Sequence, residues 1–156
     1  MKIGCTNIHR CKYISQKFSV TYNHCYIFLD DGEWHKYVTK MADERIYAAS
    51  IGFNDALFVS GGYNAKAKLT VKSTSLVYTN GTIKSSKDMP TPLYHHCMAK
   101  IYDGNTAIII GGGNDTSKSN VNKNTYIYHK SNETYTNGPG KSDGFGIRTR
   151  CTEFNR

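Results

Sequence analysis

Three consecutive residues, His95, His96 and Cys97, are the side chains of this 156-residue chain that most invite metal chemistry. Imidazole and thiolate groups are common ligands of zinc and copper. Successive side chains of a β-strand point to opposite faces, however, so His95 and His96 cannot readily bind the same ion. Cys5 and Cys11 lack the spacing of a zinc site, and no second pair accompanies them. We therefore expect no metal site and no cofactor.

Other catalytic patterns are equally weak. The sequence has no evident pair of carboxylates and no nucleophile at a recognisable spacing from a base. Residues 111–114 read Gly-Gly-Gly-Asn, but this run lacks the Lys-Ser or Lys-Thr of a phosphate-binding loop, and a strand rather than a helix should follow it. We expect that the chain is not an enzyme and that it has no catalytic residues.

The strongest pattern is an internal repeat, whose two copies span residues 53–78 and 103–128. Each copy has a polar turn, a short apolar run, a pair of glycines, a polar loop and a strand that ends in tyrosine. The glycine pairs Gly61-Gly62 and Gly111-Gly112 lie 50 residues apart. A period near fifty residues with four short strands per unit is typical of a propeller blade.

The elements that build this unit are short strands. Apolar runs of four or five residues bounded by Gly, Asn and Asp indicate strands, and no stretch keeps a helical period over three turns. The predicted strands of the first unit are residues 48–53, 56–60, 75–78 and 82–86, and those of the second are 97–102, 106–110, 125–129 and 133–137. The predicted fold class is all-β.

The glycine pairs should end the second strand of each unit. The apolar runs before them, residues 56–59 and 107–110, are expected in central strands that pack between neighbouring sheets. Gly62 and Gly112 should then leave the sheet with backbone angles that favour glycine, at places where a Cβ would clash.

Two further segments give the repeat a family resemblance. Residues 26–34 look like the second half of a preceding unit that ends at Trp34, and residues 88–97, which contain Met89-Pro90, look like the link that opens the next unit. With the repeat, these segments resemble the kelch repeats over about residues 25–140. The resemblance implies a partial kelch-type β-propeller, with about two full four-stranded antiparallel blades and partial blades at the ends.

The chain departs from the kelch pattern at the aromatic position of the fourth strand. The two full units have Ile83 and Tyr135 there, and either side chain can fill the wedge between adjacent blades. Trp34 is expected to lie buried against the sheet that follows it. The residues to which the resemblance gives a structural role are Gly61, Gly62, Gly111, Gly112, Trp34, Tyr78, Tyr128 and Tyr135.

The predicted division of the chain follows from the units. Residues 1–24 are unassigned or part of a blade, 25–140 hold the kelch-like repeats (25–41 a partial blade, 42–90 and 91–140 full blades), and 141–156 begin a further blade or form a loose tail. Since closed propellers have roughly four to eight blades, we favour a fragment of a longer product over a short dimerising product or a damaged copy. Such a fragment should self-associate, with Tyr126, Tyr128 and Tyr135 as uncovered aromatics.

Charge and hydropathy narrow the classes of partner. The net charge is +8 and the pI is about 9.2, but the lysines are scattered, and they do not alternate with aromatic residues as in proteins that stack nucleic-acid bases. No apolar run approaches the roughly 20 residues of a membrane span, and the first residues lack the apolar core of a signal peptide. We expect neither a nucleic-acid partner nor a membrane span.

The resemblance implies a protein-interaction module that binds through loops between strands. The candidate binding residues lie in the loops after the two glycine pairs: Tyr63, Asn64, Lys66, Lys68, Asn114, Lys118 and Lys123. The partner is expected to be a protein of unspecified identity. The alternatives are a fragment of a galactose-oxidase-like propeller enzyme, whose metal ligands would lie on other blades, and a truncated non-functional copy.

The compartment stays open at the level of sequence. Five cysteines fit either buried thiols in a reducing compartment or an oxidising environment. Cys97 after His-His resembles divergent extracellular kelch proteins of invertebrates. Three N-glycosylation sequons, at Asn80, Asn114 and Asn132, fall in predicted turns or loops. These features favour an extracellular location if the chain is part of a longer secreted protein. If it is not, a cytoplasmic location is expected.

Overall fold

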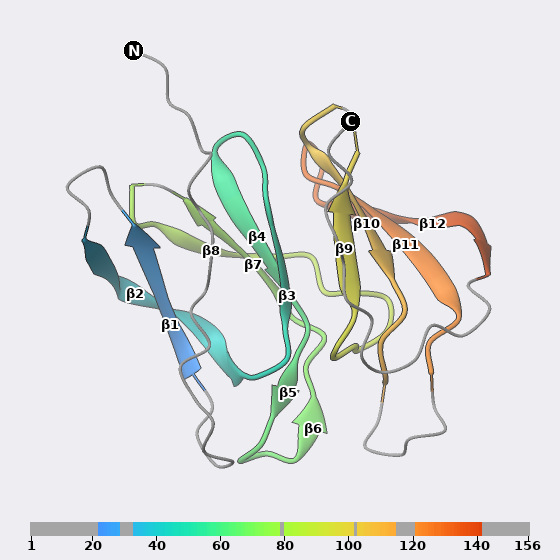
Figure 1. The fold of residues 1–156 in the computed structure, drawn as a ribbon, viewed down its shortest axis with the longest axis horizontal. Helices are drawn as coiled ribbons and strands as arrows, with labels where there is room; N and C mark the ends of the chain where they lie inside the picture. The colour runs from blue at the N-terminus through green and yellow to red at the C-terminus, as the bar shows by residue number, and fades with distance from the viewer. Residues whose placement is uncertain (1–21, 29–32, 79, 102, 115–120, 142–156) are drawn as a thin grey trace.

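The computed structural model describes residues 22–28, 33–78, 80–101, 103–114 and 121–141, and for residues 22–28, 34–38 and 141 it describes the backbone alone. Within these residues the fold is all-β and antiparallel, with no helix (Figure 1). It follows that none of the described residues forms a helix able to cross a membrane. Predictions about the Trp34 side chain, Lys118, residues 1–21 and residues 142–156 lie outside this description.

Two four-stranded sheets form the centre of the molecule. The first sheet has the order β3-β4-β7-β8, and the second has the order β12-β11-β10-β9. The strands of the first are β3 (Ala49–Gly52), β4 (Ala56–Ser60), β7 (Thr74–Tyr78) and β8 (Ile83–Ser86), and those of the second are β9 (Cys97–Lys100), β10 (Thr106–Ile110), β11 (Asn124–His129) and β12 (Thr134–Lys141). Each sheet is one predicted four-stranded unit, and β12 runs four residues beyond its predicted end.

A two-stranded sheet precedes these units. It pairs β1 (Tyr22–Phe28) with β2 (Trp34–Arg45), and its register shifts twice along the length of β2. A second small sheet, which the sequence did not predict, pairs β5 (Tyr63–Asn64) with β6 (Leu69–Thr70) inside the loop that follows the first glycine pair. This hairpin is turned by Asn64, whose side-chain oxygen accepts hydrogen bonds from the backbone N–H groups of Lys66 and Ala67 at 3.0 Å.

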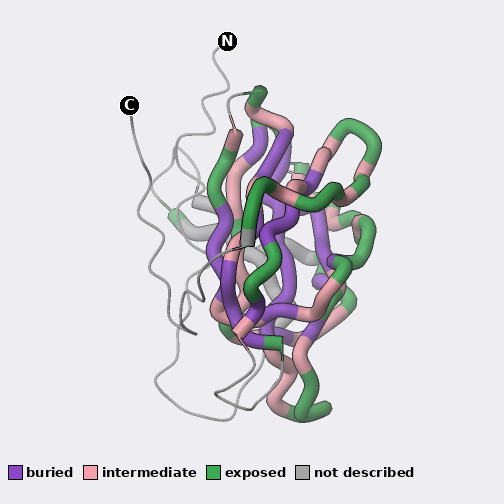
Figure 2. The backbone as a smooth tube through the Cα atoms, turned by 90° about the vertical axis from the view of Figure 1, so that its right-hand side faces the viewer, coloured by how far each residue is buried: buried purple, intermediate pink, exposed green. Residues whose placement is uncertain are grey.

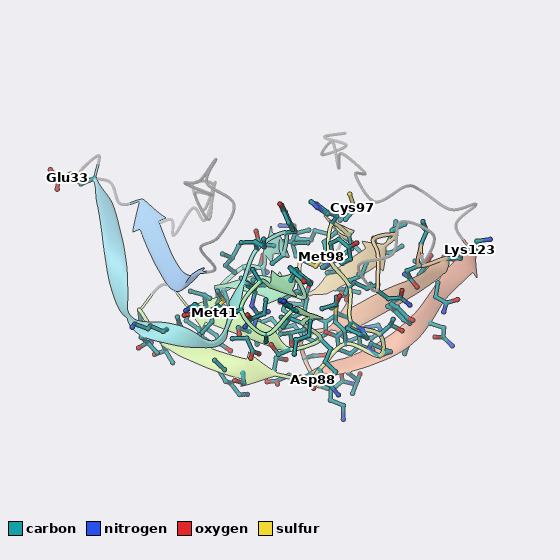
Figure 3. The ribbon with its side chains drawn as sticks, turned by 90° about the horizontal axis from the view of Figure 1, so that it is seen from below. Glu33, Met41, Asp88, Cys97, Met98 and Lys123 are labelled. Carbon is teal, nitrogen blue, oxygen red and sulfur yellow. The ribbon has the colours of Figure 1, made fainter. Side chains whose placement is uncertain are left out.

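The β1–β2 sheet and the two four-stranded sheets follow one another in a row, as the view from below shows (Figure 3). The larger core lies between the two four-stranded sheets and contains Phe58 from β4 and Tyr128 from β11, whose rings stack with centroids 4.1 Å apart and planes 8° apart. The smaller core joins Met41 of β2 to Leu57 and Val59 on the other face of β4. Because both faces of β4 are covered, all five of its residues are buried, as predicted for a central strand. Figure 2 shows burial concentrated along the strands and exposure at the turns.

The expectation that Tyr126, Tyr128 and Tyr135 are uncovered is wrong. Tyr126 and Tyr128 are only 4% and 0% exposed, and Tyr135 packs against the same core. Side chains two apart in a strand share a face, so Tyr126 and Tyr128 both point toward the first sheet while Ile127 between them points outward. Ile127 pairs across the ladder with Ile108, and both are half-buried.

The prediction for the glycine pairs is confirmed. Gly62 and Gly112 have φ angles of 107° and 82°, and Gly61 and Gly111 also have positive φ. A Cβ on Gly62 would lie 2.8 Å from the Ile46 carbonyl oxygen. The corresponding Cβ on Gly112 would lie 2.7 Å from the carbonyl oxygen of Tyr94. Both the backbone conformation and the close approach of a neighbouring segment therefore require glycine.

Candidate functional site

A buried polar pair joins the two four-stranded sheets. Nε2 of His96, next to the start of β9, lies 2.8 Å from Oγ of Ser60 at the end of β4. The Ser60 hydroxyl also donates to the sulfur of Met98 at 3.3 Å. Ser60 is 0% exposed and His96 is 6% exposed. A substrate could not reach a serine in this position, so the pair holds the sheets together and is not a nucleophile with its base.

The electrostatics of His96 agree with this structural role. Burial, with a smaller contribution from the charge of His95, lowers the pKa of His96 to about 3. Nδ1 of the same ring has no hydrogen-bond partner among the described residues. The imidazole is therefore neutral at ordinary pH. A second proton, which would make the ring cationic, would leave a buried charge with an N–H at Nδ1 that has no acceptor among the described residues.

Arg45, at the end of β2, is a second buried polar residue at this joint. Its guanidinium donates to the Gly61 carbonyl at 3.1 Å and to the carbonyl and hydroxyl oxygens of Ser73 at 2.9 and 2.7 Å. Its charge is balanced by Asp43, 3.6 Å away. The guanidinium thus supplies a donor to the Gly61 carbonyl, and it adds a second donor to the Ser73 carbonyl, which also accepts from the Gly61 N–H at 3.3 Å. In the second unit, Asn122 donates to the Gly111 carbonyl at 3.3 Å.

Four ring-bearing side chains gather where the two units begin. The ring centroids of Tyr63 and Tyr94 lie 6.2 Å apart, those of Tyr94 and His95 5.3 Å, and those of His95 and Tyr47 4.0 Å. Tyr47 is 39% exposed, and the other three are half-buried. We call these four residues the aromatic rim. It lies at the end of the sheets that also carries the β5–β6 hairpin, the lower end in Figure 1.

The backbone of the aromatic rim repeats between the units. Tyr47 and His95 lie 48 residues apart and both have positive φ, 59° and 54°. The residue before each forms an isolated antiparallel bridge, Ile46 with Tyr63 and Tyr94 with Gly113. The His95 N–H donates to the Tyr47 carbonyl at 2.9 Å and so links the two copies. Left-handed backbone at a tyrosine or histidine is uncommon and often marks a functional position.

The structure brings only one of the predicted loop residues, Tyr63, into the aromatic rim. The remaining described ones are spread over the loops: Asn64 turns the β5–β6 hairpin, Lys66 forms a 2.7 Å ion pair with Glu44, and Lys68, Asn114 and Lys123 are exposed. Sequence reasoning missed Tyr47, Tyr94 and His95 as surface residues of one cluster. The sequence signal that could have indicated them is that Tyr47 and His95 occupy equivalent positions in the two repeat units, 48 residues apart.

A hollow lies at the opposite ends of the sheets. It encloses about 270 Å³ and is lined by Leu76, Tyr78, Asn105, Lys130, Ser131 and Glu133. Its charged groups already have partners, because Lys130 pairs with Asp55 and Glu133 lies 2.5 Å from Lys84. Lys130 also lies over the Tyr78 ring, 5.9 Å from its centroid. These contacts join the two units and leave no free charge in the hollow for a ligand.

The groups considered for metal binding have other contacts. Among the described residues, no three His, Cys, Asp or Glu side chains are grouped so that they could hold an ion. His96 is bonded to Ser60, and Cys97 is disulfide-bonded. Cys97 is therefore not the reduced buried thiol that was one of the two expectations for the cysteines. The other four cysteines have side chains outside the described part.

Comparisons with known proteins bear on the fold. No family model matches the chain, and no curated protein matches it in sequence. Among solved structures it is similar to YjhT, with a TM-score of 0.63 and 16% identity over 80% of this chain and 47% of that one. It is also similar to a fungal alcohol oxidase of the AA5 family in complex with copper, with a TM-score of 0.60 and 11% identity over 74% of this chain and 26% of that one.

The chain thus spans about half of the first neighbour and about a quarter of the second. Identities this low establish the architecture and nothing about activity. Both neighbours are propellers, YjhT of the kelch type and the oxidase of the galactose-oxidase type. The chain therefore has the fold of part of a kelch-like or galactose-oxidase-like β-propeller.

Proposed function

We propose that the chain is a non-catalytic, kelch-type protein-interaction module that binds its partner through loops at one rim of the propeller. The observation that carries the proposal is the contrast between its polar and aromatic groups. Three polar side chains that could do chemistry, Ser60, His96 and Arg45, are buried and bonded to the fold, whereas Tyr47 is exposed at the rim. Aromatic side chains that are accessible at a surface are favoured at protein interfaces.

The setting proposed for this interaction is an oxidising one. The disulfide at Cys97 supports it, because disulfides persist mainly in secreted and extracellular proteins. The sequon asparagines Asn80, Asn114 and Asn132 are exposed, as glycan attachment requires.

The competing function is that of a galactose-oxidase-like enzyme, of which this chain would be a part. Its support is the likeness to the copper-containing oxidase, which covers 26% of that protein. Among the described residues no three His, Cys, Asp or Glu side chains are grouped to hold an ion, so a metal site of that kind would have to lie elsewhere. A truncated copy without function is the third reading.

The experiment that separates these functions uses the longest natural product that contains this chain. It is purified with and without added copper, and its bound copper and its release of hydrogen peroxide from simple alcohols are measured. In parallel, partners crosslinked to it are identified by mass spectrometry and rebound as purified proteins. The proposal expects a purified partner that binds directly and no alcohol oxidation. Stoichiometric copper with oxidase activity, or the absence of any direct partner, would reject it.

A further inference from the structure

We propose that the aromatic rim is the partner-binding site, and that it receives an apolar side chain, best an aromatic one, from a peptide segment with acidic residues beside it. This inference rests on the proposed function and specifies its site and the chemistry of its ligand. The aromatic rim contains residues of both units, since Tyr47 and Tyr63 come from the first, and Tyr94 and His95 from the second.

The angles between the rings indicate which shape of ligand fits. Adjacent rings are tilted by 52° between Tyr63 and Tyr94, 54° between Tyr94 and His95, and 31° between His95 and Tyr47. Rings set at such angles form a faceted surface and not the flat platform on which a row of sugar rings would stack. A single inserted side chain can meet one ring edge-to-face and the next in an offset stack, the two preferred aromatic geometries.

The aromatic rim is already organised before a ligand binds. The left-handed backbone at Tyr47 and His95 is held by the Ile46–Tyr63 and Tyr94–Gly113 bridges. Tyr94 lies directly over Gly113, because a Cβ on that glycine would be 2.8 Å from Cε1 of the ring. Rings fixed in this way lose little conformational entropy on binding, which is how a small site gains affinity.

The charges beside the aromatic rim favour acidic residues in the ligand. In the β5–β6 hairpin, which starts at Tyr63, the charged residues are Lys66 and Lys68. Lys66 is paired with Glu44, whereas Lys68 is exposed and adds positive charge. The whole chain carries a net charge of +8, so its long-range field also attracts an anionic partner.

The test selects ligands without assuming their sequence. A phage-displayed library of random dodecapeptides is panned on the purified chain, and the affinity of an enriched peptide is measured by fluorescence polarisation. The variants are Tyr47→Asn and His95→Asn, because asparagine tolerates left-handed backbone and so removes the ring with little strain. Glu133→Asn is the matched control, since it makes the same replacement at a residue with φ of 52° at the opposite ends of the sheets. Thermal unfolding confirms that each variant is folded.

We expect enriched peptides to share an aromatic or large aliphatic residue next to Asp or Glu. Tyr47→Asn and His95→Asn should each weaken binding about tenfold, the effect of losing a hot-spot contact, while Glu133→Asn changes it by less than about twofold. Lys68→Asn should reduce binding mainly at low salt.

Three results would overturn the inference. These are an enriched set without this composition, equal binding by native chain and folded rim variants, and binding of immobilised oligosaccharides in place of peptides. If a natural partner binds the rim variants as tightly as the native chain, the interaction function stands and only its site is wrong. If the natural product proves to be an oxidase, the function itself fails.

Discussion

The His96 imidazole and the Ser60 hydroxyl, 2.8 Å apart and both buried, form a side-chain hydrogen bond between the two four-stranded sheets. The same imidazole lies against Gly61, where an added Cβ would be 2.9 Å from Cε1 of His96. The histidine therefore fills the space that the glycine leaves. Its position makes the junction between the units sensitive both to protonation and to side-chain volume.

Protonation of His96 is expected to destabilise the fold. Burial lowers the pKa of His96 from 6.5 to about 3, so between these values the unfolded chain binds a proton that the folded chain does not. The unfolding free energy should therefore be at its full value above pH 6.5 and fall as the pH drops toward 3, by up to about 1.4 kcal/mol per pH unit. Urea unfolding at a series of pH values measures this slope.

The control for this titration is His96→Gln. The glutamine amide reaches about as far as Nε2, so it can still bond to Ser60 but does not titrate. The difference in slope between native chain and variant therefore isolates His96 from the carboxylates that also protonate in acid. An unchanged slope in the variant would show that His96 is not the responsible group.

Replacement of Gly112 by valine is expected to destabilise the second unit by more than about 1 kcal/mol, because its φ of 82° and its contact with the Tyr94 carbonyl leave no room for a side chain. Gly52→Ala is the matched control, since nothing lies within 4 Å of a Cβ there. Chemical denaturation of both variants gives the comparison. A loss of stability as large in Gly52→Ala as in Gly112→Val would contradict the steric explanation.

Loss of the Arg45 guanidinium is expected to cost about 2 kcal/mol or more, because Arg45→Met removes the side-chain donor of the buried Gly61 carbonyl and one of the two donors of the Ser73 carbonyl. Lys72→Met removes a cation whose partner Asp88 is 3.6 Å away, with side chains 62% and 49% exposed. That exposed pair should contribute little. If the two substitutions prove equally harmful in urea unfolding, burial of Arg45 is not what makes it important.

The isolated chain is expected to self-associate through the outer face of the second sheet, where Ile127 and Ile108 are half-buried and face away from the core. Light scattering on the purified chain should show species larger than a monomer, and Ile127→Lys should reduce them. Ser85→Lys, at an exposed position on β8 of the first sheet, is the control for added charge away from this face. A monodisperse monomer of the native chain would refute this prediction.

The sequence was sufficient to predict the strands of the two four-stranded sheets and the conformation of the glycine pairs, because these depend on residues close together in the chain. Gly62 and Gly112, for example, are marked by the apolar runs before them. It was not sufficient for the inward direction of Tyr126 and Tyr128. A strand buried on both faces gives no alternation of polar and apolar residues from which to assign a face.

The candidate site was predicted less well than the fold. The loop residues were chosen by analogy, and only Tyr63 belongs to the aromatic rim. The bonds of Arg45 and His96 connect residues 28 and 36 positions apart, the first between distant strands and loops of one unit and the second between the two units. No local pattern in the sequence marks such contacts. A left-handed tyrosine at position 47 is equally invisible, because tyrosine is not a residue type that signals positive φ.

The close approach at the glycine pairs bears on how a propeller of this kind can change its number of blades. Gly62 meets Ile46 and Ala48, and Gly112 meets Tyr94 and His96, so at these two glycines both contacting segments belong to the same unit. Gly61 instead meets Leu93 and His96 of the next unit. Duplication or deletion of one whole unit, from link to link, therefore preserves the contacts of Gly62 and Gly112 and changes only the neighbour of Gly61. A recombination point between the link and the glycine pair would instead combine halves from different units, which selection would tolerate only where the two copies had not yet diverged.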